Sequence, residues 1–284
     1  MRIFSKLHRR NGFRHTAWLS TVLVAAACTA QASAPEGLAV HNGLAASFAE
    51  LQAHVPGRLG LALMPVGGDR ALTFGDWTTG IAWSTMKVPL AVAALRNDPD
   101  IQQDDLTAAI TTSDNDAAHA LWTTLGGAEQ AAEAVERVLR ETGDTTTDVA
   151  DRHNPATPGW ADDPLVFGAT VWPLTDQVHF ASRLPCLHST ASVVDLMGRV
   201  IASQSWGLGG FIGASFKGGW GPDEITGAYT VRQFGLIPTR TGSLAVALAA
   251  QPDSGTFDDA AAALSKMAVV LAENAAELTG GHCS

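Results

Sequence analysis

Ser84 and Lys87 are spaced so that one helical turn would bring a hydroxyl and an amine together. A serine hydroxyl is a poor nucleophile at neutral pH and needs a base beside it. A lysine that is partly shielded from water has a lowered pKa and can accept that proton. If Ser84 begins a helix, backbone N–H groups would also face an oxyanion that forms on attack. The pair predicts an acyl-transfer site with Ser84 as nucleophile and Lys87 as base.

The tripeptide Ser113-Asp114-Asn115 offers two more polar groups to such a site. Ser113 would relay a proton through its hydroxyl, and the Asn115 amide would hold Lys87 or bind the substrate. Serine, aspartate and asparagine also favour the starts of helices, so a helix cap is the alternative interpretation.

A second lysine is followed by two glycines in Lys217-Gly218-Gly219. Lys217 would supply positive charge for a substrate carboxylate, and Gly219 would let a ligand approach the backbone closely. An ordinary glycine turn is the alternative. The chain has few lysines, and two of them fall in these motifs: Lys6, Lys87, Lys217 and Lys266.

Hydrophobic patterning predicts strands near both ends of the chain and helices between them. The stretch Met86 to Leu95 is apolar on every side, which is typical of a helix buried in a lobe. The proline-containing stretch 144–173 predicts a loop. The strands near both ends and the helices between them predict one sheet built from both ends of the chain, with a helical lobe packed against it. The expected strands are 57–65, 70–74, 229–235 and 243–250, and the other helical regions 44–55, 106–140, 189–203 and 256–278.

The three motifs, in this order, resemble the signature set of class A β-lactamases and penicillin-binding proteins, Ser-x-x-Lys, Ser-Asp-Asn and Lys-[Ser/Thr]-Gly. The segments 108–118 and 121–127 also look like the class A sequence around the second motif. The resemblance implies an α/β fold of class A β-lactamase type over residues 44–284. In that fold a five-stranded antiparallel sheet, flanked by the terminal helices, lies beside an all-α lobe.

Three departures from the family pattern limit what the resemblance implies. Ser84 and Ser113 are closer in sequence than the corresponding family residues, which implies a more open cleft. Gly218 stands where the family has Ser or Thr, so a hydroxyl that helps to hold the substrate carboxylate is missing. The third departure concerns the release of the acyl group.

Class A enzymes carry Arg-x-Glu-Pro-x-x-Asn in a loop, and its Glu activates the water that frees the acyl group. Here Arg152-His153-Asn154-Pro155 takes that place, so Asn154 replaces the Glu, and Pro158 the loop Asn. An amide cannot accept a proton as a carboxylate does, and no Glu occurs between 142 and 223. We therefore expect slow deacylation. The remaining candidate bases are Asp151, Asp162 and Asp163, with His153 a weaker one.

The first 28 residues are typical of an export signal, with a basic start and an apolar run from Ala17 to Ala27. Two cleavage interpretations stay open. Residues 25–28 resemble a lipobox in which Cys28 would carry a lipid anchor, whereas residues 29–34 would suit an ordinary signal peptidase. Residues 29–43 predict a tether. The protein is thus expected to be exported, either anchored on the outer face of the membrane or secreted.

The chain is acidic, with a formal net charge of −10. A surface of that sign repels phosphate backbones, so no nucleic-acid partner is expected. No spacing of His or Cys suggests a metal, and no cofactor is expected. After removal or lipidation of Cys28, Cys186 and Cys283 remain; they could form a disulfide in an oxidising compartment or be two buried thiols. We expect a monomer.

Three functions fit these residues. The first is an exported penicillin-recognising serine hydrolase that forms an acyl-enzyme with a β-lactam or a cell-wall D-alanyl peptide, through Ser84, Lys87 and Ser113. The second is a catalytically retired lipoprotein that binds cell-envelope components; Gly218 and Asn154 favour it. The third is an esterase that uses the same Ser-x-x-Lys pair.

Overall fold

The computed structural model describes residues 42–101, 103–154, 159–223 and 226–283. The predicted export signal, Cys28 and nearly all of the predicted tether lie outside these residues. The helix α1 (Asn42–His54) starts slightly earlier than expected, so the last two residues assigned to the tether are helical.

One antiparallel sheet of five strands, in the order β2-β1-β5-β4-β3, forms the centre of the fold. The prediction that both ends of the chain build one sheet is confirmed, because β1 pairs with β5 along its whole length. The strands are β1 (Gly57–Pro65), β2 (Leu72–Gly75), β3 (Ser215–Pro222), β4 (Tyr229–Thr239) and β5 (Gly242–Pro252).

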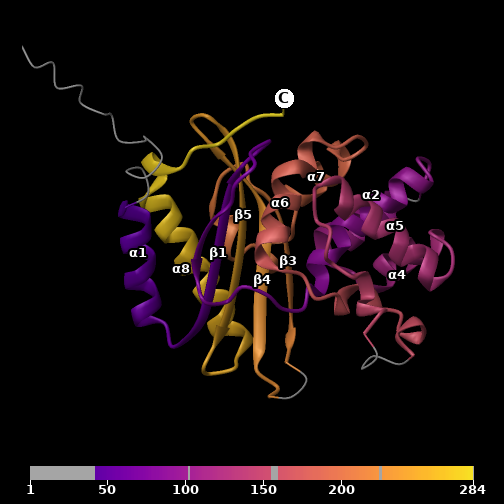
Figure 1. Ribbon diagram of the computed structural model, residues 1–284, viewed down its shortest axis with the longest axis horizontal. Helices are drawn as coiled ribbons and strands as arrows, with labels where there is room; N and C mark the ends of the chain where they lie inside the picture. Colours follow the sequence, from indigo (N-terminus) through magenta and orange to yellow (C-terminus); the bar gives the residue numbers. More distant parts are fainter. Residues whose placement is uncertain (1–41, 102, 155–158, 224–225, 284) are drawn as a thin grey trace, which may run out of the picture. The chain divides into compact units, whose positions relative to one another are not determined.

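Helices cover both faces of this sheet (Figure 1). α1 and α8 pack together on one face, and α6 lies against β1, β4 and β5 on the other face, next to a helical lobe. The fold class expected from the sequence is confirmed. The remaining helices are α2 (Lys87–Asn97), α3 (Gln103–Thr107), α4 (Asn115–Thr124), α5 (Ala128–Glu141), α6 (Leu174–Arg183), α7 (Ala191–Met197) and α8 (Phe257–Glu273).

Two elements were absent from the pattern-based prediction. β3 contains Gly218, Gly219 and Gly221, and glycine weakens any strand pattern because it has no side chain to pack. α6 begins directly after Pro173, the last residue of the predicted loop 144–173. Proline is common in loops, but it also suits the start of a helix. Lys217 therefore lies within an edge strand, not in a turn before the last strands.

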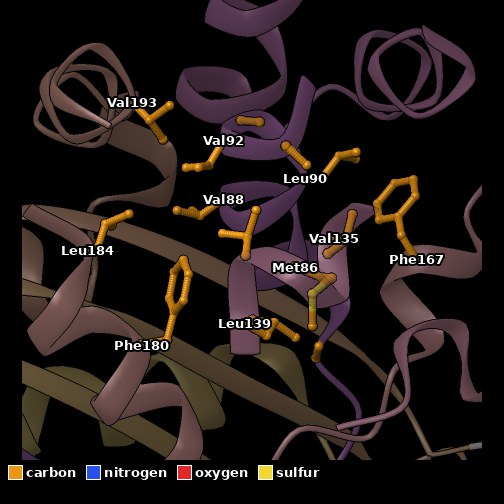
Figure 2. Close-up of a cluster of buried hydrophobic side chains, with 14 of the residues drawn as sticks. Met86, Val88, Leu90, Val92, Val135, Leu139, Phe167, Phe180, Leu184 and Val193 are labelled. Carbon is orange, nitrogen blue, oxygen red and sulfur yellow. The ribbon is translucent and has the colours of Figure 1, made fainter. Parts of the chain in front are cut away.

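The helix α2 is the centre of the helical lobe, as its apolar sequence predicted. All of its residues from Lys87 to Leu95 are buried. Figure 2 shows Val88, Leu90 and Val92 of this helix surrounded by apolar side chains from several other elements. Pro89 lies in the first turn, where its missing N–H is not needed by the helix. Burial on every side fixes the residues just before α2, which include Ser84.

A disulfide joins Cys186 to Cys283, so the first of the two alternatives for these cysteines is confirmed. It connects the end of α6 to the end of the chain, with Cα atoms 5.3 Å apart. The bridge closes a loop with a sequence separation of 97 residues. A loop of this length restricts the unfolded chain strongly.

Replacing both cysteines with serine is expected to lower the free energy of unfolding by about 4 kcal/mol and the Tm by about 10 °C, because the unfolded chain regains its freedom. Thermal unfolding followed by circular dichroism measures this. The single variants Cys186→Ser and Cys283→Ser should each lower the free energy of unfolding as much as the double variant does. If the decreases in the two single variants add up in the double variant, a bridge between Cys186 and Cys283 is contradicted.

Candidate active site

Ser84 lies in a short 3-10 turn, η1 (Trp83–Met86), that leads directly into α2. Side chains three residues apart are eclipsed in a 3-10 turn, so Ser84 and Lys87 share one side. Trp83 has a φ of 50°, in the left-handed region that an indole side chain rarely occupies. Ser84 is half-buried, and the two residues that follow it, Thr85 and Met86, are fully buried, so buried neighbours fix the position of this candidate nucleophile.

Arg232 of β4 holds the segment that precedes this turn. Its guanidinium donates to the carbonyl oxygens of Gly80 (2.9 Å) and Ile81 (3.1 Å), and also to Gln177 Oε1 of α6 (2.9 Å). The Gln177 amide in turn donates to Thr85 Oγ1 at 3.0 Å. Arg232 is fully buried, so a network of charge-assisted hydrogen bonds ties the sheet and α6 to the turn that carries Ser84.

Gly219 of β3 packs directly against the same turn. A methyl group at this position would lie 2.9 Å from the backbone nitrogen atoms of both Ser84 and Thr85. Only glycine therefore lets the edge strand approach the nucleophile so closely. The sequence analysis predicted that Gly219 lets a ligand approach the backbone, which stays a prediction; in the structure the neighbours of Gly219 include the backbone of Ser84.

Ser113 is placed by an unusual backbone at the end of a π-helical turn, η2 (Ala108–Thr112). Its φ is 60°, and it turns the chain sharply between η2 and α4. Asp114 then caps α4 by accepting a hydrogen bond from Ala117 N at 2.8 Å. The helix-cap interpretation is thus correct for Asp114, while Ser113 and Asn115 remain available to the site. Conformations of this kind cluster at functional sites.

The amine of Lys87 has three close acceptors, all in this turn. It donates to Ser113 O (2.6 Å), Asn115 Oδ1 (2.7 Å) and Asp114 O (3.1 Å). The Ser113 hydroxyl lies 3.5 Å away. Of the two roles considered for Asn115, the structure shows that its amide holds Lys87. Burial lowers the pKa of Lys87 to about 8, with the charge of Asp114 acting in the opposite direction.

Lys217 reaches the same hydroxyl from β3. Its amine lies 2.9 Å from Ser113 Oγ and 2.9 Å from the Gly218 carbonyl oxygen. Lys217 is fully buried. Burial, and then the charge of Lys87, lower the pKa of Lys217 well below its usual value. The three motifs therefore meet at one atom, the Ser113 hydroxyl oxygen, which lies between two lysines.

The expected hydrogen bond between Ser84 and Lys87 is not formed. Within the part of the chain that the structure describes, Ser84 Oγ makes no hydrogen bond, because the Lys87 amine is directed to Ser113, Asp114 and Asn115. The structure thus brings Lys87, Ser113, Asn115 and Lys217 into one network and Gly219 against Ser84. Ser84 itself is half-buried.

The segment packed against the Ser84 turn on the helical side is η5 (Val166–Ala169). It contains no acidic residue. The stretch that contains Asn154 comes earlier in the same loop, and a 2.6 Å ion pair between Arg152 and Glu136 anchors it to α5. Asn154 is exposed and donates to Asp151 Oδ2 at 2.7 Å.

Two residues that the sequence analysis missed contribute to this site. Arg232 and Gln177 position the turn before Ser84, but a single buried arginine in a strand gives no recognisable signal in one sequence.

In the described part of the chain, no group of acidic, His or Cys residues is arranged to hold a metal ion. None of the described helices is both long and apolar enough to cross a membrane.

Solved structures of similar fold cover most of this chain. A β-lactamase from Xanthomonas campestris pv. campestris has a TM-score of 0.62 and 19% sequence identity, over 82% of this chain and 98% of its own. A class A β-lactamase from Mycobacterium abscessus has a TM-score of 0.58 and 18% identity, over 81% and 98%. A β-lactamase from Sphaerobacter thermophilus has a TM-score of 0.59 and 18% identity, over 82% and 97%.

These likenesses show a class A β-lactamase-like fold, as the resemblance of the motifs implied. No family model matches the chain, and no curated protein matches it. At such low identity the likeness establishes the fold, and the chemistry has to be argued from the site itself.

The pKa of Lys87 predicts how the reactivity of Ser84 depends on pH. A proton can move to Lys87 only when its amine is neutral, so labelling of Ser84 by a fluorophosphonate should rise about tenfold per pH unit below the pKa. It should level off above a pH of about 8. A Lys87→Met variant, which keeps most of the side-chain length but has no amine, should label slowly at every pH. A wild-type rate that does not change with pH would contradict a role for Lys87 as the base.

Proposed function

We propose that this protein is a serine hydrolase that forms an acyl-enzyme at Ser84 with a β-lactam or a cell-wall D-alanyl peptide, and releases the acyl group slowly. The observation that carries the proposal is the meeting of Lys87, Lys217 and Ser113 beside the turn that presents Ser84. A lysine pair around one hydroxyl, next to a half-buried serine, is suited to proton transfer during acyl transfer.

In the proposed reaction Ser84 Oγ attacks the carbonyl carbon, and its proton passes to Lys87. With a β-lactam the ring C–N bond breaks, and the nitrogen takes that proton through Ser113, so the whole molecule stays attached. With a D-alanyl peptide the terminal D-alanine leaves with the proton. The backbone N–H of Ser84, close to Gly219, lies at the start of the buried helix, where an oxyanion is stabilised.

Slow release follows from the surroundings of Ser84. Hydrolysis of an ester intermediate needs a base that activates water. Asn154 stands where the class A pattern has its Glu, and the segment packed on the Ser84 turn is Val166–Ala169, which has no carboxylate. These observations support a protein that acylates more readily than it deacylates.

The mature protein mixed with a penicillin should gain the mass of one penicillin molecule at Ser84 and hold it. Intact-mass spectrometry over several hours measures this, and peptide mapping locates the adduct. Ser84→Ala should gain nothing. The proposal is wrong if the wild type shows neither an adduct nor consumption of the penicillin; a short-lived adduct would contradict slow release alone.

Asn154→Glu should shorten the lifetime of this adduct by about tenfold or more, because general-base catalysis contributes factors of this size. The matched control is Asn154→Gln, which adds the same length without a carboxylate and should leave the lifetime unchanged. Following the loss of adduct mass after excess penicillin is removed gives both rates. If Asn154→Glu and Asn154→Gln change the lifetime of the adduct equally, the slow release is not caused by a missing base at position 154.

A retired, ligand-binding role is the second candidate, because the Lys87 amine already has three acceptors and Ser84 Oγ makes no hydrogen bond among the described residues. The absence of any adduct with penicillin, together with ligand binding that survives Ser84→Ala, would favour it. Turnover of a chromogenic short-chain ester that is lost in Lys87→Ala would favour the esterase instead.

We further propose that the protein works outside the cytoplasm, either lipid-anchored through Cys28 or secreted. The basic and apolar start of the chain supports export. The disulfide between Cys186 and Cys283 supports an oxidising compartment. Small, soluble acyl donors of the cell envelope would be the partners there.

A further inference from the structure

A tight turn between η8 (Gly207–Gly210) and β3 presents an isoleucine to the surroundings. Ile212 is 97% exposed, the most of any large apolar side chain that the structure describes. Ala214 N closes the turn by donating to Phe211 O at 3.2 Å, and Gly213 inside it has a φ of 78°. Phe211 packs against the core beneath α8, and Ala214 is buried. The isoleucine therefore stands on a closed turn held by its neighbours.

The sequence around this turn is free of charge. Between Arg199 and Lys217 the chain contains no Asp, Glu, Lys, Arg or His, although charged residues make up 16% of the whole chain. A single exposed apolar side chain is common on protein surfaces and has no meaning by itself. What it means here depends on where in the fold the turn lies.

The turn lies at the end of the sheet where β3 begins and β4 ends. Ser215 at the start of β3 pairs with Leu236 near the end of β4. A methyl group at Gly213 would lie 3.7 Å from Cγ of Pro238, which is itself exposed. β5 also starts at this end, because residues 240–241 join it to β4 in a tight turn.

The first described helix starts at the same end of the fold. Ser243 of β5 and Gly281 exchange two backbone hydrogen bonds of 2.9 Å. Glu277, four residues earlier, accepts a hydrogen bond from Leu44 N in the first turn of α1 at 3.2 Å. In Figure 1, α1 begins beside the end of α8. The segment that precedes α1 in the chain therefore leaves from the end of the sheet that carries Ile212.

A lipid anchor on Cys28 would keep this end close to a bilayer. Thirteen residues separate Cys28 from Asn42, which span about 50 Å at most when fully extended. A tether of this length gives an effective concentration on the order of millimolar. Full burial of an isoleucine side chain shifts an equilibrium by roughly tenfold to a hundredfold. This is too little to hold a free domain on a membrane, but enough to orient one that is already tied there.

We propose that Ile212 inserts into the lipid surface to which Cys28 is anchored, so that this end of the fold is the membrane-facing end. The inference rests on the lipid-anchored form of the proposed location and does not depend on the chemistry at Ser84. Gly219, which contacts the Ser84 backbone, lies four residues along β3 from Ser215, or about 14 Å. The contact keeps the candidate active site near the membrane.

A fluorophore that responds to its surroundings tests the contact on the lipidated protein in phosphatidylcholine vesicles. The lipid occupies the thiol of Cys28 and the disulfide occupies the other two cysteines, so Ile212→Cys supplies a single thiol for nitrobenzoxadiazole. The label should be quenched several-fold by spin-labelled lipids. The matched control is Val269→Cys on α8, which is 54% exposed and should stay in water. Equal quenching at the two positions, or none at 212, overturns the inference.

A label at Gly210 reports the same contact with Ile212 in place, because a side chain added there meets nothing within 4 Å. Adding Ile212→Asp should lower the quenching of this label about tenfold or more, since a carboxylate resists leaving water and the gain from apolar burial is lost. Ile212→Leu should leave the quenching unchanged. Quenching that survives Ile212→Asp overturns the inference.

The intact mass of the purified mature protein separates the two levels of the argument. A protein without a lipid overturns the anchored location and this inference together. A lipidated protein whose labels stay in water overturns the inference alone. Adduct formation at Ser84 is measured independently, so the proposed reaction is unaffected by either result.

Discussion

The position of the nucleophile depends on one buried cation. Arg232 carries its guanidinium into the interface between the sheet and the helical lobe, where burial lowers its pKa to about 9. The cost of burial is offset by carbonyl oxygens of Gly80, Ile81 and Trp172, by Gln177, and by stacking on Trp77 at 5.0 Å. Gly80 and Ile81 come just before the Ser84 turn. Arg232 of β4 therefore helps to set where α2 begins.

A second constraint is the shared hydroxyl of Ser113. Two ammonium groups around one oxygen repel each other, and burial together with the charge of Lys87 lowers the pKa of Lys217 well below its usual value. Burial also lowers the pKa of Lys87, whose amine donates to three acceptors in the turn before α4. The strained backbone at Ser113 is what makes this possible, since its φ of 60° turns both its carbonyl oxygen and its hydroxyl toward lysines.

The sequence predicted the candidate site residues where a motif gave their chemistry, and it predicted helices and strands where apolar residues follow a clear pattern. Ser84, Lys87, Ser113 and Lys217 could be named from their types and order, and β1, β4, β5 and α2 from apolar patterns. It was uninformative where a residue acts through a distant partner. Nothing near Arg232 in the chain indicates that it binds the backbone before Ser84, and the glycines that hid β3 are explained only by Ser84 and Trp206 on its two faces. Similarly, spacing placed Lys87 near Ser84 but could not show that its amine turns to Ser113.

The groups proposed for acylation and the loop proposed to lack a base for release belong to different parts of this fold. The groups proposed for acylation come from α2, the turn before α4, and β3, and each is held by buried contacts that also stabilise the fold. The loop that would supply the water-activating base is anchored separately, through Arg152 and Glu136 on α5. Asn154 lies in an exposed stretch and donates to Asp151 Oδ2, and substitutions at exposed positions usually change stability little. Loss of the base is therefore compatible with an intact acylation network, and a long-lived adduct is the expected result.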